Sequence, residues 1–350
     1  MKSNYDILGN HIRLIDTRNR ESITDRVLGI NIDKFFMPSV ANVIGTDLSK
    51  YKLITKGKFA CNPMHVGRDE RLPVALYDEE KPAIVSPAYF MFEVIDNSIL
   101  NEDYLMMWFR RPEFDRICWL HTDGSVRGGI TWDDICRLEL PIPPIENQLE
   151  IVNSYKAITE RIALKQKIND NLEAMLAAVF ADTFSADNAA ERSKLSELMS
   201  FGNGKSRPKT DGTIPVYGGN GILSYTDQHN IENAILIGRV GAYCGSVYLE
   251  QGICWVSDNA IYAKSKISKD EFFDYFLLKG LNLFNHHVGT GQQLLTQEIL
   301  NNIEVAKPDI EQIAAFNENA KAVYETIAKN ENEIIRLQEL SSLLLSRLAG

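Results

Sequence analysis

The stretch HTDGSVRGGIT at residues 121–131 recurs as HHVGTGQQLLT at residues 286–296, an offset of 165 residues. Each copy runs into a short apolar strand, a proline, a glutamine and a long helical pattern, as LELPIPPIENQ at 138–148 and IEVAKPDIEQ at 303–312. A repeat of this length is far longer than the roughly 20–50 residues of a solenoid unit. The sequence therefore predicts two similar modules, each followed by a similar helix, and a function that is carried out twice.

The two helical tails carry inward-facing stripes at alternating steps of four and three residues, which is typical of a coiled coil. The first stripe comprises Ile151, Tyr155, Ile158, Ile162, Lys165, Asn169, Leu172, Leu176 and Val179. The second comprises Ile313, Phe316, Ala320, Val323, Ile327, Asn330, Ile334, Leu337, Ser341, Leu344 and Leu348. Neither tail contains glycine or proline before Gly350.

Polar residues interrupt both stripes near the middle: Lys165 and Asn169 in the first, and Asn330 in the second. If the helices pair antiparallel about these midpoints, the three side chains meet. A buried polar residue commonly fixes the register of paired helices at some cost in stability. The alternative is that these positions are solvated or frayed.

A chain of 350 residues suits two domains. We predict globular modules at 1–144 and 185–307, and long helices at 145–184 and 308–350. Apolar runs predict strands in both modules, including 58–61, 89–95, 234–237 and 245–249, and helices at 102–109 and 270–278. The predicted fold is α+β, with two similar globular α/β modules, each followed by a long helix.

Composition limits the class of protein. The five cysteines form no CxxC pair and no zinc spacing, which suits a reducing compartment. No signal peptide and no apolar run of membrane-spanning length is present, so we predict a cytoplasmic protein with no membrane partner. The net charge of −10 argues mildly against binding to nucleic acid, but basic residues cluster locally at 205–209.

Sequence motifs of catalysis are missing. There is no Walker loop, Rossmann fingerprint, HExxH or GxSxG motif. The segment Asn62-Pro63-Met64-His65 faintly resembles the Asn-Pro-Pro-Tyr motif of amino-methyltransferases, but it lacks the second proline and the aromatic residue, so a strand-ending turn is the better interpretation. His286 and His287 have no third ligand at a useful spacing, and we predict no metal site. The sequence thus predicts a protein that is not an enzyme.

Glycine-rich loops with basic and amide side chains are the remaining candidates for function. Arginine can bind guanine through two hydrogen bonds, asparagine can do the same for adenine, and glycine lets a backbone approach phosphates. The candidate DNA contacts in the second module are Lys205, Arg207, Lys209, Tyr217, Asn220, Arg239 and Tyr243. Those in the first module are Arg18, Asn19, Arg20, His65, Arg68 and Arg71. For any one of them, an ordinary solvated loop residue is the alternative.

With these residues in place, the chain resembles the specificity (S) subunit of type I restriction-modification systems over essentially its full length. The resemblance rests on the duplicated segment, the strand that ends in proline, the glutamine that enters a long helix, and the signatures IPVYGGNG at 214–221 and IGRVG at 237–241. In the first module, 62–67 and 85–87 look like variants of these signatures. The second tail departs from the first around its proline, so the geometry of that junction is left open.

The resemblance implies a non-catalytic subunit whose two target-recognition domains each read half of a bipartite, asymmetric DNA site. It also implies that the two domains are separated by an antiparallel coiled coil of the two long helices, with pseudo-two-fold symmetry. It implies two methyltransferase subunits that dock on the assembly and bring S-adenosylmethionine, with restriction subunits joining the complex; the chain itself would need no cofactor. A helix of ~35 residues spans roughly 50 Å, on the order of 15 base pairs, so the helix pair would set the spacer between half-sites. A self-contained adenine methyltransferase and a coiled-coil adaptor without a DNA role are the alternatives.

Overall fold

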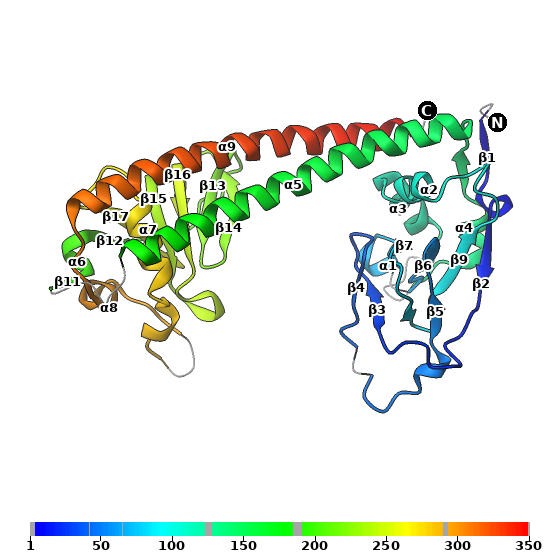
Figure 1. The fold of residues 1–350 in the computed structure, drawn as a ribbon, viewed down its shortest axis with the longest axis horizontal. Helices are drawn as coiled ribbons and strands as arrows, with labels where there is room; N and C mark the ends of the chain where they lie inside the picture. Colours follow the sequence, from blue (N-terminus) through cyan, green and yellow to red (C-terminus); the bar gives the residue numbers. More distant parts are fainter. Residues whose placement is uncertain are drawn as a thin grey trace. The chain divides into compact units, whose positions relative to one another are not determined.

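The computed structural model describes residues 4–41, 43–64, 66–122, 128–184, 191–289 and 293–348. The chain forms two compact units, one made of residues 1–164 and 334–350 and the other of residues 165–333. Each unit contains one globular module and a part of both long helices, and Figure 1 shows these elements coloured along the chain. No helix within the described residues has the length and apolar character needed to cross a membrane.

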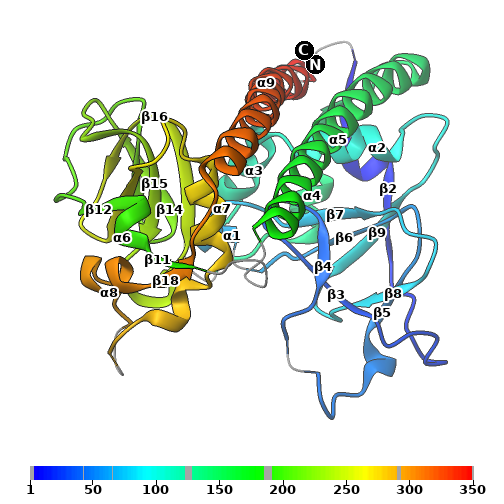
Figure 2. The same cartoon turned by 60° about the vertical axis from the view of Figure 1, so that its left-hand side comes forward.

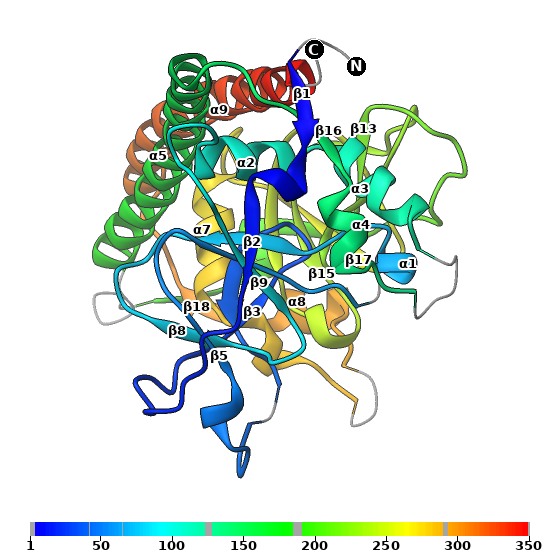
Figure 3. The same ribbon diagram turned by 90° about the vertical axis from the view of Figure 1, so that its right-hand side faces the viewer.

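Two four-stranded sheets and the helices α2 and α3 form the main part of the first module (Figure 3). One sheet has the order β2 (Ile12–Ile15), β9 (Phe90–Val94), β6 (Lys58–Cys61), β7 (Val74–Tyr77), and the other β4 (Phe36–Pro38), β3 (Val27–Ile30), β8 (Ala83–Val85), β5 (Lys52–Ile54). The helices are α2 (Glu102–Phe109) and α3 (Pro112–Leu120). Phe59 and Phe92 stack at 5.0 Å, and both pack edge-on against Phe109, so aromatic rings join the first sheet to α2.

The second module is a six-stranded sheet covered by α7 (Phe272–Gly280), which lies between the sheet and the long helices (Figure 2). The strand order is β12 (Met199–Asn203), β17 (Ala260–Ser265), β15 (Ile231–Gly238), β16 (Val247–Val256), β13 (Ile214–Gly218), β14 (Gly221–Thr226). Side chains alternate along β15, as the period of two in a strand requires: Ile235 and Ile237 pack beneath α7, whereas Leu236 packs on the opposite face.

The repeated segment ends in the same structural device in both modules. Thr131 caps α4 (Trp132–Cys136) by accepting a hydrogen bond from the Asp134 amide, and Thr296 caps α8 (Gln297–Asn302) by accepting one from Ile299. The next strand pairs antiparallel with the first strand of its own module. These pairs are β10 (Glu139–Pro141) with β1 (Tyr5–Ile7), and β18 (Glu304–Ala306) with β11 (Arg192–Lys194). The predicted duplication is confirmed, although residues 123–127 and 290–292 lie outside the described part.

The shorter elements connect these parts. They are the helices α1 (Val66–Asp69) and α6 (Leu195–Leu198), and the 3-10 turns Leu8–Asn10, Leu48–Lys50, Gly241–Tyr243 and Leu283–His286.

The long helices are α5 (Ile145–Thr183) and α9 (Ile310–Arg347). Every predicted stripe position of α9 is buried or half-buried. The stripe of α5 follows the prediction as far as Leu176, but its last position is wrong, because Val179 is 44% exposed and Phe180 turns inward instead. Phe180 packs on the rings of Phe273 and Phe316, so a further step of four residues replaces the expected step of three.

The two helices run antiparallel in each unit. In the second unit Phe180 contacts Phe316, Glu173 contacts Tyr324, and Lys165 contacts Asn330, so numbers rise along α5 as they fall along α9. In the first unit residues 151–155 share an apolar cluster with residues 345–348. The α+β class, with two mixed modules and a pair of long antiparallel helices, is therefore confirmed.

Candidate nucleic-acid interface

Four segments of the second module contact one another and form what we call the loop cluster: residues 203–209, 217–221, 238–246 and 257–259. The turn 257–259 touches the other three. The Lys205 amide donates to Val256 at 2.9 Å beside this turn, the Ser257 amide donates to Tyr217 at 2.9 Å, and the Arg239 amide donates to Asn259 at 3.0 Å. Sheet register thus brings together segments that are far apart in the sequence.

All seven sequence-predicted residues of the second module lie in this cluster. Lys205, Arg207, Lys209, Asn220 and Tyr243 are exposed, and within the described ranges the three cationic side chains of the first segment make no ion pair with a carboxylate. Their charges are therefore free to meet phosphates.

Arg239 occupies the middle of the loop cluster and is half-buried. Its backbone is fixed on both sides, because its amide donates to Asn259 and its carbonyl accepts from the Leu295 amide at 2.9 Å. The Nε atom is buried and has no hydrogen-bond partner among the described residues. A charged side chain without an acceptor, on a fixed backbone, suits an anionic or guanine-like ligand.

Tyr217 has a different place from the one expected. It is 8% exposed, and its hydroxyl donates a 3.0 Å hydrogen bond to Glu250. Burial, reinforced by Glu250, raises the pKa of Tyr217, so the hydroxyl remains a donor. Tyr217 is therefore a buried structural residue of the loop cluster, and its hydroxyl is not available to a ligand.

Two glycines of the cluster, Gly204 and Gly238, allow close packing within the protein. A Cβ atom on Gly204 would collide with the carbonyl group of Ser257, and one on Gly238 would collide with the carbonyl oxygen of Tyr243. These two glycines let the cluster's own segments approach each other, and the approach of the cluster's backbone to phosphates stays a prediction.

The described candidates of the first module do not form one site. Arg18 donates to the Lys50 carbonyl at 2.7 Å and pairs with Asp16 at 2.6 Å. Arg20 is exposed. Asn19 is 1% exposed, and its side-chain amide bonds to the backbone of Thr24 and Leu48, so it shapes the loop and is not available to a base.

The other first-module candidates lie near α1. Arg68 pairs with Asp69 at 2.6 Å, and Arg71 pairs with Asp33 at 2.9 Å. His65 is outside the described residues. Because Arg18, Arg68 and Arg71 already have carboxylate partners, their charge is less available to phosphates than that of the loop cluster.

Asn62 closes a turn, as expected. The Met64 amide donates to the Asn62 side chain at 3.1 Å just after β6 ends, and the Pro63 carbonyl accepts from Ile130 at 3.2 Å. Among the described residues, no group of three or more His, Cys, Asp or Glu side chains is placed to hold a metal ion.

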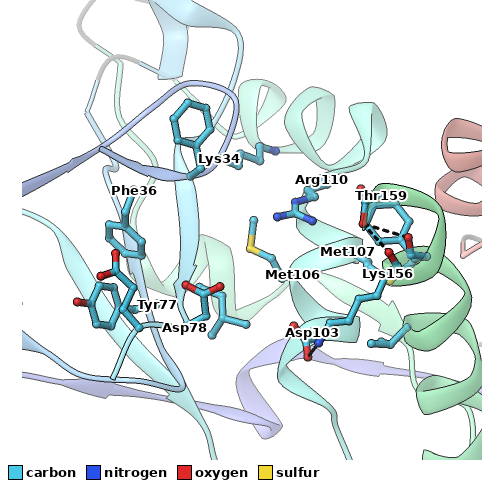
Figure 4. Close-up of a pocket in the computed structure, with 15 residues that line it drawn as sticks. Lys34, Phe36, Tyr77, Asp78, Asp103, Met106, Met107, Arg110, Lys156 and Thr159 are labelled. Carbon is cyan, nitrogen blue, oxygen red and sulfur yellow. Dashed lines mark hydrogen bonds and ion pairs between the residues drawn. The ribbon is translucent and has the colours of Figure 1, made fainter. Parts of the chain in front are cut away.

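A cavity of ≈ 260 Å³ lies in the first unit where the β3–β4 hairpin meets α2 and α5 (Figure 4). Its walls include Phe36, Tyr77 and Arg110, and an ion pair of 2.6 Å between Lys156 of α5 and Asp103 of α2 lies on its helical side. None of the predicted DNA contacts lines it. The cavity belongs to the junction between module and long helix.

Buried amides from the long helices hold each module, which the sequence did not reveal. Gln148 of α5 is 0% exposed, accepts from the Asn101 amide at 2.9 Å and donates to the carbonyls of Ile99 and Pro143. The sequence pairs Gln148 with Gln312, but Gln312 is exposed. In the second module the same role falls to a residue further along α9.

Asn317 plays that role. It is 3% exposed, accepts from the Phe273 amide at 2.8 Å at the start of α7, and donates to Ser268 at 2.9 Å. Both amides thus satisfy backbone groups where a module helix begins. Asn317 lies on the inward face of the heptad pattern, next to Phe316, and a polar residue there is the signal that could have found it.

The three polar residues of the stripes meet in the second unit. Lys165 donates to the Asn330 side chain at 2.9 Å and pairs with Glu333 at 2.8 Å. Asn330 donates in turn to Asn169 at 2.8 Å.

The sequence also overlooked Asn203 and Asn259, exposed amides of the loop cluster. The turn between β16 and β17 was the available signal for Asn259.

Fold and site together define a class: a two-module protein whose modules are carried by paired helices and whose second module presents a basic loop surface. Residues 189–337 match the family model of the type I restriction modification DNA specificity domain. A curated relative, the type I restriction enzyme EcoprrI specificity subunit of Escherichia coli, is 26% identical over 161 residues, which are 42% of this chain and 39% of the relative.

Two solved structures share the fold. The type I restriction-modification S subunit from M. genitalium has a TM-score of 0.62 and 16% identity, over 99% of this chain and 96% of that one. A chain from work on complex assembly and conformational transition of the type I R-M system has a TM-score of 0.51 and 16% identity, over 98% and 96%. Residues 189–337 therefore match the type I restriction modification DNA specificity domain, and the chain over its whole length has the fold of these solved structures.

Proposed function

We propose that this chain is the DNA sequence-recognition and scaffold subunit of a type I restriction-modification complex, and that residues 1–144 and 185–307 each read one half of a bipartite, asymmetric site. One observation carries the proposal: a duplicated module, one copy of which presents exposed amides beside an exposed run of cations that make no ion pair with any described carboxylate. Cations without partners supply phosphate affinity, and amides can read base edges.

The long helices have a second role in this proposal, which is to set the number of base pairs between the half-sites and to dock two methyltransferase subunits. In the second unit, α5 exposes Ile168, Met175 and Val179, which are 40%, 49% and 44% exposed and recur at heptad-like steps. In the first unit, α9 exposes Ile335 and Leu343, which line a shallow surface with Ser342. Apolar stripes on the outside of a helix pair suit further helices.

Catalysis lies with partner subunits in this proposal. S-adenosylmethionine and the adenine chemistry belong to the methyltransferase subunits, restriction subunits join through the complex, and the assembly works in the cytoplasm. The net charge of −10 is compatible with DNA binding because the partner subunits supply much of the surface that neutralises phosphates. Tight binding of the isolated chain to its site with a steep salt dependence would contradict that last point.

Methylome sequencing tests the proposal. Cells that carry this subunit with its methyltransferase should show adenine methylation at a split motif with a fixed spacer, and cells without the subunit should not. An active system without such a motif would contradict the proposal and favour a coiled-coil adaptor. Binding of S-adenosylmethionine to the isolated chain, measured by titration calorimetry, would instead favour a self-contained methyltransferase.

A further inference from the structure

Three helices of the second unit converge on one carboxylate, that of Glu173. Glu173 lies on α5, and its Oε1 atom accepts hydrogen bonds from the Tyr275 hydroxyl at 2.8 Å and the Lys279 ammonium at 2.9 Å, both on α7. From α9, the Tyr324 hydroxyl donates to the same atom at 3.4 Å. We call these four residues the Glu173 cluster.

Electrostatics keep this cluster ionised at Glu173 and protonated at its donors. Burial alone would raise the pKa of Glu173, but the hydrogen bonds from Lys279 and Tyr275 outweigh it and hold the pKa below its ordinary value. Burial raises the pKa of both Tyr275 and Tyr324, so each hydroxyl keeps the proton that it donates. The contacts are therefore charge-assisted, which makes them stronger and more directional than neutral ones.

Ring contacts surround the cluster and are less selective. Phe272 stacks on Tyr324 at 5.0 Å, and the Lys279 ammonium lies 5.2 Å from the centre of the Tyr275 ring. Apolar packing is non-directional, so on its own it would hold α7 near the long helices at more than one angle. Hydrogen bonds that share one acceptor atom permit only a narrow range of angles between α7 and the long helices.

Among its described residues, the first unit has no counterpart of the Glu173 cluster at the offsets of the repeat. The positions 164 and 165 residues after Glu173 are Leu337 and the exposed Gln338, and those before Tyr324 are the exposed Glu160 and Thr159, which bonds to its own helix at Tyr155. By contrast, the contact of Lys156 with Asp103 has a counterpart in Lys321, which lies 3.8 Å from Asp270. The modules thus share this ion pair and the buried amide anchors Gln148 and Asn317, and the second module has the Glu173 cluster in addition.

We propose that Glu173 is a positioning residue that fixes the angle of the second module on the helix pair, so that the loop cluster reaches its half-site at a single spacer length. The inference rests on the proposed function and extends it from the helices to the joint between module and helix. Glu173 touches no base in this account, and it acts through α7 and the sheet that α7 covers.

The test uses the whole methyltransferase complex and DNA duplexes with both half-sites, taken from the wild-type methylome. The duplexes carry the natural spacer or a spacer one base pair shorter or longer, and initial methylation rates are compared. Glu173→Gln removes the charge but keeps the shape. We expect it to reduce discrimination against altered spacers by roughly tenfold, since hydrogen bonds to a charged group are at stake, while both half-site sequences stay the same.

Glu160→Gln is the matched control, because Glu160 is an exposed carboxylate on the same helix, and its discrimination should equal that of the wild type. If Glu173→Gln does not yield folded subunit, Tyr275→Phe and Lys279→Gln carry the same expectation, because each leaves Glu173 with its other donors. Unchanged discrimination in the folded variants would overturn the inference, as would a changed half-site sequence. A wild-type complex with no split motif would instead overturn the proposed function.

Discussion

The Lys165 ammonium on α5 donates a 2.9 Å hydrogen bond to the Asn330 side chain on α9. Asn330 donates in turn to Asn169, and Lys165 also pairs with Glu333, so the contact is part of a polar network within the second unit. The stripe positions next to this network, Leu172 and Ile327, are apolar.

Asn330→Ala tests this contact. The change removes the acceptor of Lys165 and the donor to Asn169, both half-buried, and should lower the free energy of unfolding by about 1–2 kcal/mol. Asn332→Ala is the control, since Asn332 is exposed on the same helix, and its effect should stay within about 0.5 kcal/mol. Urea denaturation followed by circular dichroism measures both. Equal effects of the two changes would mean that the polar contact contributes nothing.

A lengthened helix pair tests the spacer role. Seven residues inserted after Asn169 in α5, with seven more after Thr326 in α9, add about 10 Å, or roughly three base pairs. The methylome should then show a longer spacer with both half-sites unchanged. Seven residues in α5 alone leave the stripes out of register and should abolish activity. Altered half-site sequences would place recognition outside the globular modules.

Gln148→Ala should be strongly destabilising, whereas Gln312→Ala should not. The buried Gln148 satisfies one amide and two carbonyls, and unpaired buried groups cost roughly 1–3 kcal/mol each, so we expect a loss of about 3 kcal/mol. Gln312 is exposed, and its loss should cost less than about 0.5 kcal/mol. Thermal melting of the two variants tests this prediction. Similar melting temperatures would contradict the assignment of Gln148, and not Gln312, as a buried anchor.

The cations of the loop cluster should contribute affinity without sequence information. In the complex, Arg207→Ala combined with Lys209→Ala should weaken DNA binding and reduce the slope of log affinity against log salt by roughly 2. Lys269→Ala is the control, because this exposed lysine lies beyond the far end of β17 from the cluster. Fluorescence anisotropy at several salt concentrations gives the slopes. A double variant with the wild-type slope would remove these residues from the interface.

Asp274 should make stability depend on pH. It is 1% exposed, and burial raises its pKa to about 7 from an ordinary 3.8, against a Ser265 hydrogen bond that lowers it. The folded chain therefore keeps a proton that the unfolded chain releases, so this contribution is complete below pH 3.8 and is lost as pH rises through about 7.

Asp274→Asn does not titrate, so the melting temperature of this variant should rise relative to that of the wild type as the pH increases from 5 to 8. The reason is that the wild type loses about 1.4 kcal/mol of stability for each pH step over which unfolding releases this one proton. Asp182→Asn, at an exposed position of α5, should follow the wild-type curve. Parallel curves for Asp274→Asn and wild type would show that Asp274 is ionised throughout this range.

Features that depend on local periodicity could be predicted from the sequence. The heptad pattern identified both long helices and their inward faces, because a helix repeats its faces every few residues regardless of its neighbours. The pattern failed only at Val179, where Phe180 finds aromatic partners on α7 and α9. The repeat predicted the duplicated modules, and the loop composition predicted most of the cluster at Lys205, Asn220 and Arg239.

By itself, the sequence determined that two modules share one plan and that two helices pair, since repetition and periodicity need no knowledge of contacts. Only the tertiary structure decided which polar side chains turn inward. Asn19 and Tyr217 were predicted to contact DNA and are buried. Gln148, which belonged to the repeated motif, and Asn317 and Glu173, which belonged to none, hold the modules to the helices. Such roles depend on which donor and acceptor atoms come within about 3 Å across long stretches of chain, and strand register and helix packing set those distances.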